Sequence, residues 1–267
     1  MNDLLSGCFA KLERASETLA DLTSEIETFN AKAAKQIDMK GAISRDGLEY
    51  VLTASGAVAI PSRYAVLTGE VIHHMRSALD HLICALVVAN GGSITKQHQF
   101  PICSTRDLYK RAGDKGMIRG LKPSSYAIIE AQQPYHQANP IDTILAVVQD
   151  YDNQDKHRLL LVTSSVAAVH DQITIGGGLR EGVDGVARGP NIIGFKDFEP
   201  AELNAVGVRV FSCQFSEPVA DFYVKAEPRF HVALKQCGAV KNAVLPFTMN
   251  NILAGVRGTI GLFETEF

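Results

Sequence analysis

The stretch that decides the fold is SRYAVLTGEVIHHMRSALDHLICALVVAN, residues 62–90. It contains no proline and precedes the pair Gly91-Gly92, so it can form one uninterrupted helix of roughly 43 Å. When successive residues are placed about 100° apart, apolar side chains fill one arc and polar side chains fill the complementary arc. The apolar arc holds Val71, Ile72, Met75, Ala78, Leu79, Leu82, Ile83, Ala85 and Leu86; the polar arc holds Glu70, His73, His74, Arg76, Ser77, Asp80 and His81. The first arc predicts a face packed in a core, and the second indicates a face that could carry chemistry.

A second amphipathic segment lies at the N-terminus. Its apolar residues recur at alternating steps of three and four, a spacing typical of a long helix that packs along another helix. They are Leu5, Cys8, Leu12, Ala15, Leu19, Leu22, Ile26, Phe29 and Ala33. Because alanine and cysteine occupy part of this seam, we expect a bundle helix beside residues 62–90 in preference to the arm of a coiled-coil dimer.

The composition is that of a globular protein that buries a core. The chain has 267 residues, 46% of them hydrophobic, and a net charge of −3, so nucleic-acid binding would need a local basic patch. The five cysteines are scattered and never form C-x-x-C, which favours reduced thiols and a cytoplasmic location. No apolar run approaches ~20 residues, so we expect no membrane span.

In the remaining sequence the spacing of apolar residues changes several times between that of a helix and that of a strand, which predicts an α+β fold. A hairpin is predicted around Asp46-Gly47, and Asn139-Pro140 predicts the start of a helix that continues to about Val166. Strands are predicted at 173–175, 191–195, 206–215 and 219–227 from their composition and the turns between them. The predicted organisation is a helical bundle at 1–166 with an inserted hairpin at 36–61, a small antiparallel sheet at 167–247 packed on the bundle, and a C-terminal helix at 248–267.

The residues R-S-A-L-D-H at Arg76–His81 could cleave RNA through its 2′-hydroxyl. A histidine moves protons near neutral pH, and an arginine neutralises the charge that develops on a phosphate. Arg76 and His81 lie about 140° apart on a helix, so they share a groove only because the arginine side chain is long. Asp80 could orient the imidazole or pair with Arg76 one turn earlier.

This segment resembles the R-x-x-x-x-H motif of HEPN-domain proteins, which are helical-bundle ribonucleases and nucleotide-binding modules of bacterial defence and toxin systems. The resemblance implies catalytic roles for Arg76, His81 and Asp80, a metal-independent endoribonuclease or an RNA- or nucleotide-binding protein, no cofactor, and a homodimer that joins two motifs in one cleft. Ser77 departs from the residues that often follow the arginine. The chain also resembles an uncharacterised bacterial family with LRSALDHL-type and DKHR segments, with Met75 in place of the first leucine.

The second polar segment is DYDNQDKHR at Asp150–Arg158. Lys156, His157 and Arg158, together with Ser77, are the predicted substrate-binding residues. If the helix that carries this segment lies against residues 62–90, the two polar segments meet, with Asn153 and His157 facing His74 or His81.

Two other functions fit the same residues. The polar face could bind a small ligand or a partner without catalysis. Alternatively, Glu70-x-x-His73 has the spacing of a di-iron helix, and His74, His81 and His157 could hold one metal ion. A purely structural interpretation also remains, in which Arg76 pairs with Asp80 and His81 is buried.

Overall fold

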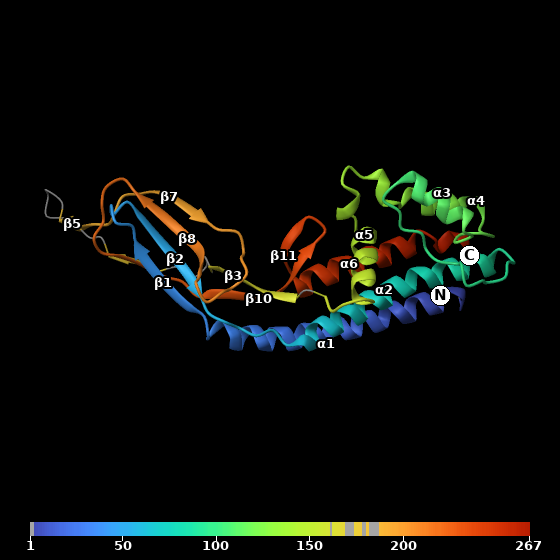
Figure 1. The fold of residues 1–267 in the computed structure, drawn as a ribbon, viewed down its shortest axis with the longest axis horizontal. Coiled ribbons are helices and arrows are strands. Elements are labelled where there is room, and N and C mark those ends of the chain that lie inside the picture. The colour runs from blue at the N-terminus through green and yellow to red at the C-terminus, as the bar shows by residue number, and fades with distance from the viewer. Residues whose placement is uncertain (1–2, 161, 169–173, 178–179, 182–186) are drawn as a thin grey trace. The chain divides into compact units, whose positions relative to one another are not determined.

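The computed structural model describes residues 3–160, 162–168, 174–177, 180–181 and 187–267. The protein has an α+β fold, as predicted (Figure 1). Its contacts divide the chain into two compact units. The first contains Met1–Glu25, Pro61–Val162 and Leu234–Phe267, and the second contains Ile26–Ile60 and Thr163–Ala233.

The first unit is helical. Its helices are α1 (Ser6–Ala34, of which the last turns belong to the second unit), α2 (Ser62–Ala89), α3 (Arg106–Asp114), α4 (Pro123–Ala131), α5 (Ile144–Asp155) and α6 (Leu245–Gly261). Helices α1 and α2 run antiparallel, since Gly7 lies beside His81 at one end and Glu25 bonds to Arg63 and Tyr64 at the other. The bundle helix expected at the N-terminus is thereby confirmed.

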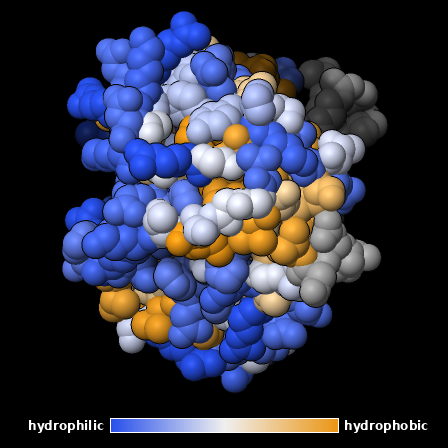
Figure 2. All heavy atoms as spheres, turned by 90° about the vertical axis from the view of Figure 1, so that its right-hand side faces the viewer, coloured by the Kyte–Doolittle hydropathy of each residue, from blue (hydrophilic) through white to orange (hydrophobic). Residues whose placement is uncertain are grey.

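The predicted arcs of both long helices are confirmed by burial. All nine apolar residues of the α2 arc are buried, and so is the α1 seam except for Phe29, which is half-buried. By length and composition α2 could also cross a membrane, but 61% of its most apolar window is buried inside the fold, as in the core helix of a globular protein. Figure 2 shows that hydrophilic side chains surround an apolar patch on one face.

The second unit is built on an antiparallel sheet. Its strand order is β1 (Asp38–Ile43), β2 (Glu49–Ser55), β8 (Val208–Phe215) and β7 (Ile192–Asp197). Outside this sheet the described strands are β3 (Val162–Ala168), β4 (Thr174–Gly177), β5 (Arg180–Glu181), β6 (Ala187–Arg188), β9 (Phe222–Lys225), β10 (Pro228–Cys237) and β11 (Val240–Val244). Of these, β11 belongs to the first unit, and β10 begins in the second unit and ends in the first. Strands β4, β7, β8 and β9 lie at the four predicted strand positions; residue 173 lies outside the described residues.

The expected domain boundaries differ from those observed. The predicted hairpin at 36–61 forms, and Gly47 takes the positive φ of 73° that its turn requires. It belongs to the second unit instead of the bundle, because the outer edge of β2 pairs with β8, with Tyr50 opposite Cys213. A strand edge needs a partner for its backbone groups, and the local pattern does not say which distant strand supplies it.

The predicted helix from Pro140 to Val166 is also corrected. Pro140–Asp142 form a short 3-10 turn, and α5 begins after Thr143, whose hydroxyl accepts from Ala146 N. The helix ends at Asp155, and β3 starts at Val162. The sequence VTSSVAA of β3 contains β-branched and hydroxyl residues that favour a strand over a helix. The C-terminal helix is α6 at Leu245–Gly261, earlier than the predicted 248–267.

Candidate functional site

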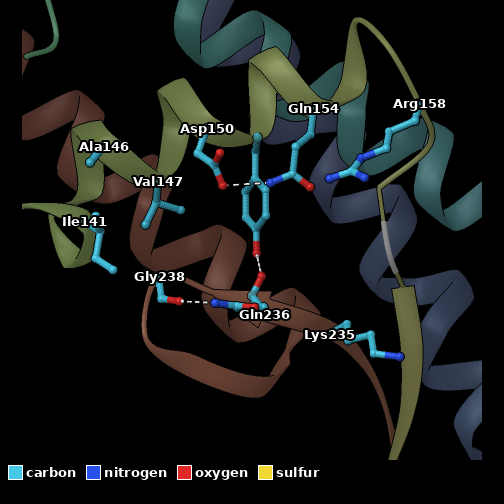
Figure 3. A pocket seen from close by; sticks show the side chains of 10 residues that line it. Ile141, Ala146, Val147, Asp150, Gln154, Arg158, Lys235, Gln236 and Gly238 are labelled. Atoms are coloured by element: carbon cyan, nitrogen blue, oxygen red, sulfur yellow. Dashed lines mark hydrogen bonds between the residues drawn. The ribbon is translucent and has the colours of Figure 1, made fainter.

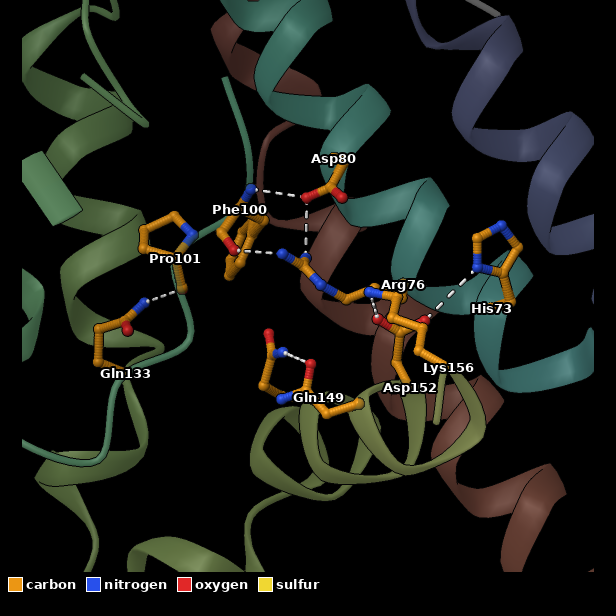
Figure 4. Close-up of polar contacts among 10 residues, drawn as sticks. His73, Arg76, Asp80, Phe100, Pro101, Gln133, Gln149, Asp152 and Lys156 are labelled. Carbon is orange, nitrogen blue, oxygen red and sulfur yellow. Dashed lines mark hydrogen bonds and ion pairs between the residues drawn. The ribbon is translucent and has the colours of Figure 1, made fainter. Parts of the chain in front are cut away.

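The arginine of the motif is buried in the first unit. The Arg76 residue is 7% exposed, and its Nη2 donates to the carbonyl of Phe100 at 2.9 Å. Its Nη1 lies 2.9 Å from Asp80 Oδ1, which also accepts from the backbone N–H of Phe100 at 2.8 Å (Figure 4). The Nη1 atom is buried against Asp80, so the carboxylate and the carbonyl of Phe100 together hold the guanidinium.

Burial governs the charge of Asp80. Desolvation raises the pKa of this carboxyl above its ordinary value, and the nearby charge of Arg76 opposes the shift. The pair therefore places a partly buried carboxylate beside a guanidinium whose charge favours the ionised form. Asp80 pairs with Arg76, which is one of the two roles expected for it.

A second buried carboxylate joins α5 to α2. The Asp152 side chain is 2% exposed, and its oxygens lie 2.5 Å from Lys156 Nζ and 3.5 Å from His73 Nδ1. The helices approach closely where α2 has a glycine: a Cβ on Gly69 would lie only 2.2 Å from Asp155 Oδ1. The expectation that the two polar segments meet is confirmed, although Asp152 and Asp155 make these contacts instead of Asn153 and His157.

Arg76, Asp80 and Lys156 border a cavity of about 440 Å³ in the first unit. Its walls come from α2, α3, α5 and the loop at 97–103. They are formed by Arg76, Asp80, Gln99, Phe100, Ile102, Cys103, Leu108, Arg111, Ala112, Lys115, Met117, Gln149, Asn153 and Lys156. Four of these residues are cationic and one is a carboxylate, so the cavity is locally basic although the chain is acidic overall.

Two of the cations come from the end of α3. Arg111 lies in the last turn of this helix, and Lys115 is its C-cap residue. Within the described part of the chain, neither has a carboxylate partner, and both side chains are exposed. The sequence analysis did not select Arg111 and Lys115. The available signal was the i, i+4 spacing of the two cations, which would place them on one face of a helix.

The predicted site residues divide between different surroundings. Arg76, Asp80 and Lys156 line the cavity together. His81 is exposed and lies against α1, where a Cβ on Gly7 would be 2.8 Å from its Nδ1, and it is not a lining residue. Ser77 is half-buried and His157 is exposed, and neither borders the cavity. A single chain thus does not bring Arg76 and His81 into one cleft.

The fourth predicted binding residue, Arg158, lines a different cavity. This cavity of about 510 Å³ lies between α5 and the turn from β10 to β11 (Figure 3). There, Asp150 accepts from Gln154 Nε2 at 2.7 Å, and the hydroxyl of Tyr151 donates to the carbonyl of Gln236. The two sides of α5 therefore line two separate cavities.

The geometry does not favour the metal alternative. Among the described residues, no group of three or more His, Cys, Asp or Glu side chains could hold a metal ion, so His74, His81 and His157 do not come together. Burial, followed by the charge of Lys11, lowers the pKa of His74. The Nδ1 atom of its neighbour His73 lies 3.5 Å from Asp152 Oδ1.

Comparisons with known proteins add no relative. No family model, no curated protein and no solved structure matches the chain. The resemblance to HEPN-domain proteins stays a prediction that rests on the motif.

Proposed function

We propose that the basic cavity of the first unit binds a phosphate-bearing ligand, either a nucleotide or a phosphate of RNA. The observation that carries this proposal is the gathering of Arg76, Arg111, Lys115 and Lys156 on one cavity wall, where Arg111 and Lys115 have no carboxylate partner among the described residues. A planar guanidinium binds phosphate oxygens through charge-assisted hydrogen bonds, which are stronger where water is excluded.

The remaining cations extend this site. Arg111 and Lys115 approach the cavity from α3, and Lys156 approaches it from α5. Their charge would attract an anion and neutralise more than one phosphate oxygen. Asp80 balances Arg76, and the buried Asp152 balances Lys156, so Arg111 and Lys115 supply the remaining positive charge. The site therefore favours an anion over a cation.

The geometry supports binding more than cleavage. Cleavage through a 2′-hydroxyl needs a group that transfers a proton within hydrogen-bond reach of the substrate. His81 does not line the cavity, so in a single chain the phosphate site lacks the proposed proton donor. Ribonuclease activity and the homodimer that would bring together two motifs stay predictions of the resemblance.

Binding can be tested with paired double variants. Arg111→Ala/Lys115→Ala removes two lining charges, whereas Lys96→Ala/Lys110→Ala removes two exposed charges that are not among the lining residues. Inorganic phosphate, adenosine monophosphate and a single-stranded RNA oligonucleotide serve as calorimetric probes, and they distinguish a free nucleotide from a polymer.

We expect the first double variant to lose about tenfold or more in affinity, with the RNA salt slope reduced by about one to two. The second should bind like the wild type. Equal binding by the two double variants, or absence of binding by the wild type, would contradict the proposal. Degradation of the RNA in the presence of EDTA, lost in His81→Ala, would instead support cleavage.

A further inference from the structure

Another cavity of the first unit lies beside the C-terminal end of α2. It has a volume of about 440 Å³, and its walls come from the end of α2, the loop at 92–98 and the turn at 115–120. It is lined by Val87, Gly92, Ser93, Thr95, Gln97, His98, Lys115, Gly116, Arg119 and Gly120. Two of these described residues are cationic and none is acidic, so this Arg119 cavity favours an anion.

The histidine of the Arg119 cavity is a buried hydrogen-bond donor. His98 is 7% exposed, and its Nδ1 accepts from the backbone N–H of Thr95 at 3.0 Å. Because Nδ1 is the acceptor, the neutral imidazole carries its proton on Nε2. Among the described residues Nε2 has no hydrogen-bond partner, and it is not sealed from solvent, so it opens to the cavity. A buried N–H that opens to a cavity takes its acceptor from there, as water or as a ligand oxygen.

The turn at 115–120 holds the guanidinium of Arg119 at this cavity. Asn90 Nδ2 donates to the carbonyl of Gly120 at 2.9 Å, which ties the turn to the end of α2. The guanidinium lies beside Gly116, where a Cβ would be 3.7 Å from its Nε and Nη2. Within the described part of the chain no carboxylate pairs with Arg119. Its charge therefore remains available to a ligand.

The Arg119 cavity and the cavity of Arg76 lie on two sides of one backbone contact. The N–H of Gln99 donates to the carbonyl of Met117 at 3.2 Å, and both of these residues line the cavity of Arg76. Their chain neighbours His98 and Gly116 line the Arg119 cavity instead. Lys115 borders both cavities, whereas His98 and Arg119 border only the second of the two.

We propose that the Arg119 cavity is a second oxyanion site, in which the His98 Nε2–H, Arg119 and Lys115 bind the oxygens of a phosphate monoester. The two lining cations match the charge of a monoester, which is close to −2 near neutral pH, better than the single charge of a carboxylate. The inference goes beyond the proposed function, because His98 and Arg119 do not line the cavity of Arg76.

The test compares methyl phosphate with acetate, which both carry one methyl group, at equal ionic strength and a pH of about 8, where the monoester is a dianion. Nuclear magnetic resonance follows the Nε2–H signal of His98 and the Nε–H signals of Arg119 and Arg111. These signals report the two cavities separately, because Arg111 lines only the cavity of Arg76 among the two.

Three variants separate the roles of the side chains. His98→Asn keeps an acceptor for the N–H of Thr95, since Oδ1 takes the place of Nδ1, and it removes the Nε2 donor. Arg119→Gln removes a charge from an exposed residue, so it leaves the core intact. Lys96→Gln is the matched control, because this exposed lysine lies on the same loop as His98 and is not a lining residue.

We expect the His98 and Arg119 signals of the wild type to shift with methyl phosphate, which should bind about tenfold more tightly than acetate. Arg119→Gln, followed by the His98 signal, and His98→Asn, followed by the Arg119 signal, should each weaken binding about tenfold. Lys96→Gln should bind like the wild type. Equal binding of acetate, or wild-type affinity in both lining variants, would overturn the inference.

The signals also distinguish this inference from the proposed function. If only the Arg111 signal responds to methyl phosphate, the second site is refuted and the proposed function stands. If only the His98 and Arg119 signals respond, the second site stands and the proposed function fails. If none of the three signals responds, both fail.

Discussion

Replacing Arg76 by methionine tests whether the buried pair stabilises the first unit. Methionine keeps most of the apolar stem, so the change removes the charge and the donors with little loss of packing. It leaves the carbonyl of Phe100 without its side-chain donor and Asp80 without its cation. Breaking a fully buried pair costs about 3–5 kcal/mol. The Asp80 side chain is 31% exposed and keeps its bond from the Phe100 N–H, so we expect about 2–3 kcal/mol.

The same substitution should make stability more dependent on pH. Burial already raises the Asp80 pKa above 3.8 in the folded protein, and Arg76 limits the shift. Without Arg76 the folded pKa rises further, so the folded state binds a proton more tightly than the unfolded chain does. The free energy of unfolding of the variant then falls as pH rises through this window. The deficit relative to the wild type is full above the raised pKa and shrinks in acid.

Urea unfolding, followed by the helical circular dichroism signal at neutral and acidic pH, measures both effects. Lys110→Met is the control, since this exposed lysine on α3 is not a lining residue and its loss should stay within about 0.5 kcal/mol. A double-mutant cycle with Asp80→Asn should give a coupling of about 1–2 kcal/mol. A cost for Arg76→Met below about 0.5 kcal/mol, or a cost that does not change with pH, would refute the reasoning.

Two further stability predictions concern close packing and a buried carboxylate. Gly69→Ala should destabilise the protein by about 1–2 kcal/mol, because the added Cβ would meet Asp155. Gly258→Ala in α6, where a Cβ meets no atom within 4 Å, should stabilise the protein by about 0.5–1 kcal/mol. Thermal denaturation should therefore show a lowered melting temperature for the first variant and a raised one for the second. Ser125 Oγ donates to Glu266 Oε2 at 2.6 Å and, with a second serine, lowers the pKa of that carboxyl. Ser125→Ala should therefore cost about 1 kcal/mol at neutral pH and progressively less as pH falls through the lowered pKa, and an acid titration of stability that shows a constant difference would contradict this.

Much of the fold could be predicted because its signals are local. The apolar arc of α2 and the seam of α1 follow from a period of 3.6 residues, and Asp46-Gly47 indicates a turn by its backbone preference. The end of α5 was mispredicted because the apolar spacing beyond Asp155 fits a helix and a buried strand almost equally well. The partner of β2 was not predictable, since β8 is far along the chain and period-two patterns fit many partners.

Part of the candidate site could also be predicted from the sequence, and part could not. The sequence singled out Arg76, Asp80 and Lys156 by charge and helix position, and the structure places them in one cavity. The sequence analysis also grouped His81 with Arg76. The spacing of residues along one helix does not show which other segments pack against each of its sides.

The sequence by itself determined two amphipathic helices with polar segments, because the periodic spacing of apolar and polar side chains can be read from residues close together in the chain. Only the tertiary structure decided that Arg76 is buried against the loop at 97–103 while His81 lies against α1. The physical reason is that a cavity and its charge arise where separate segments converge, and Arg111 and Lys115 reach the cavity of Arg76 only through that convergence.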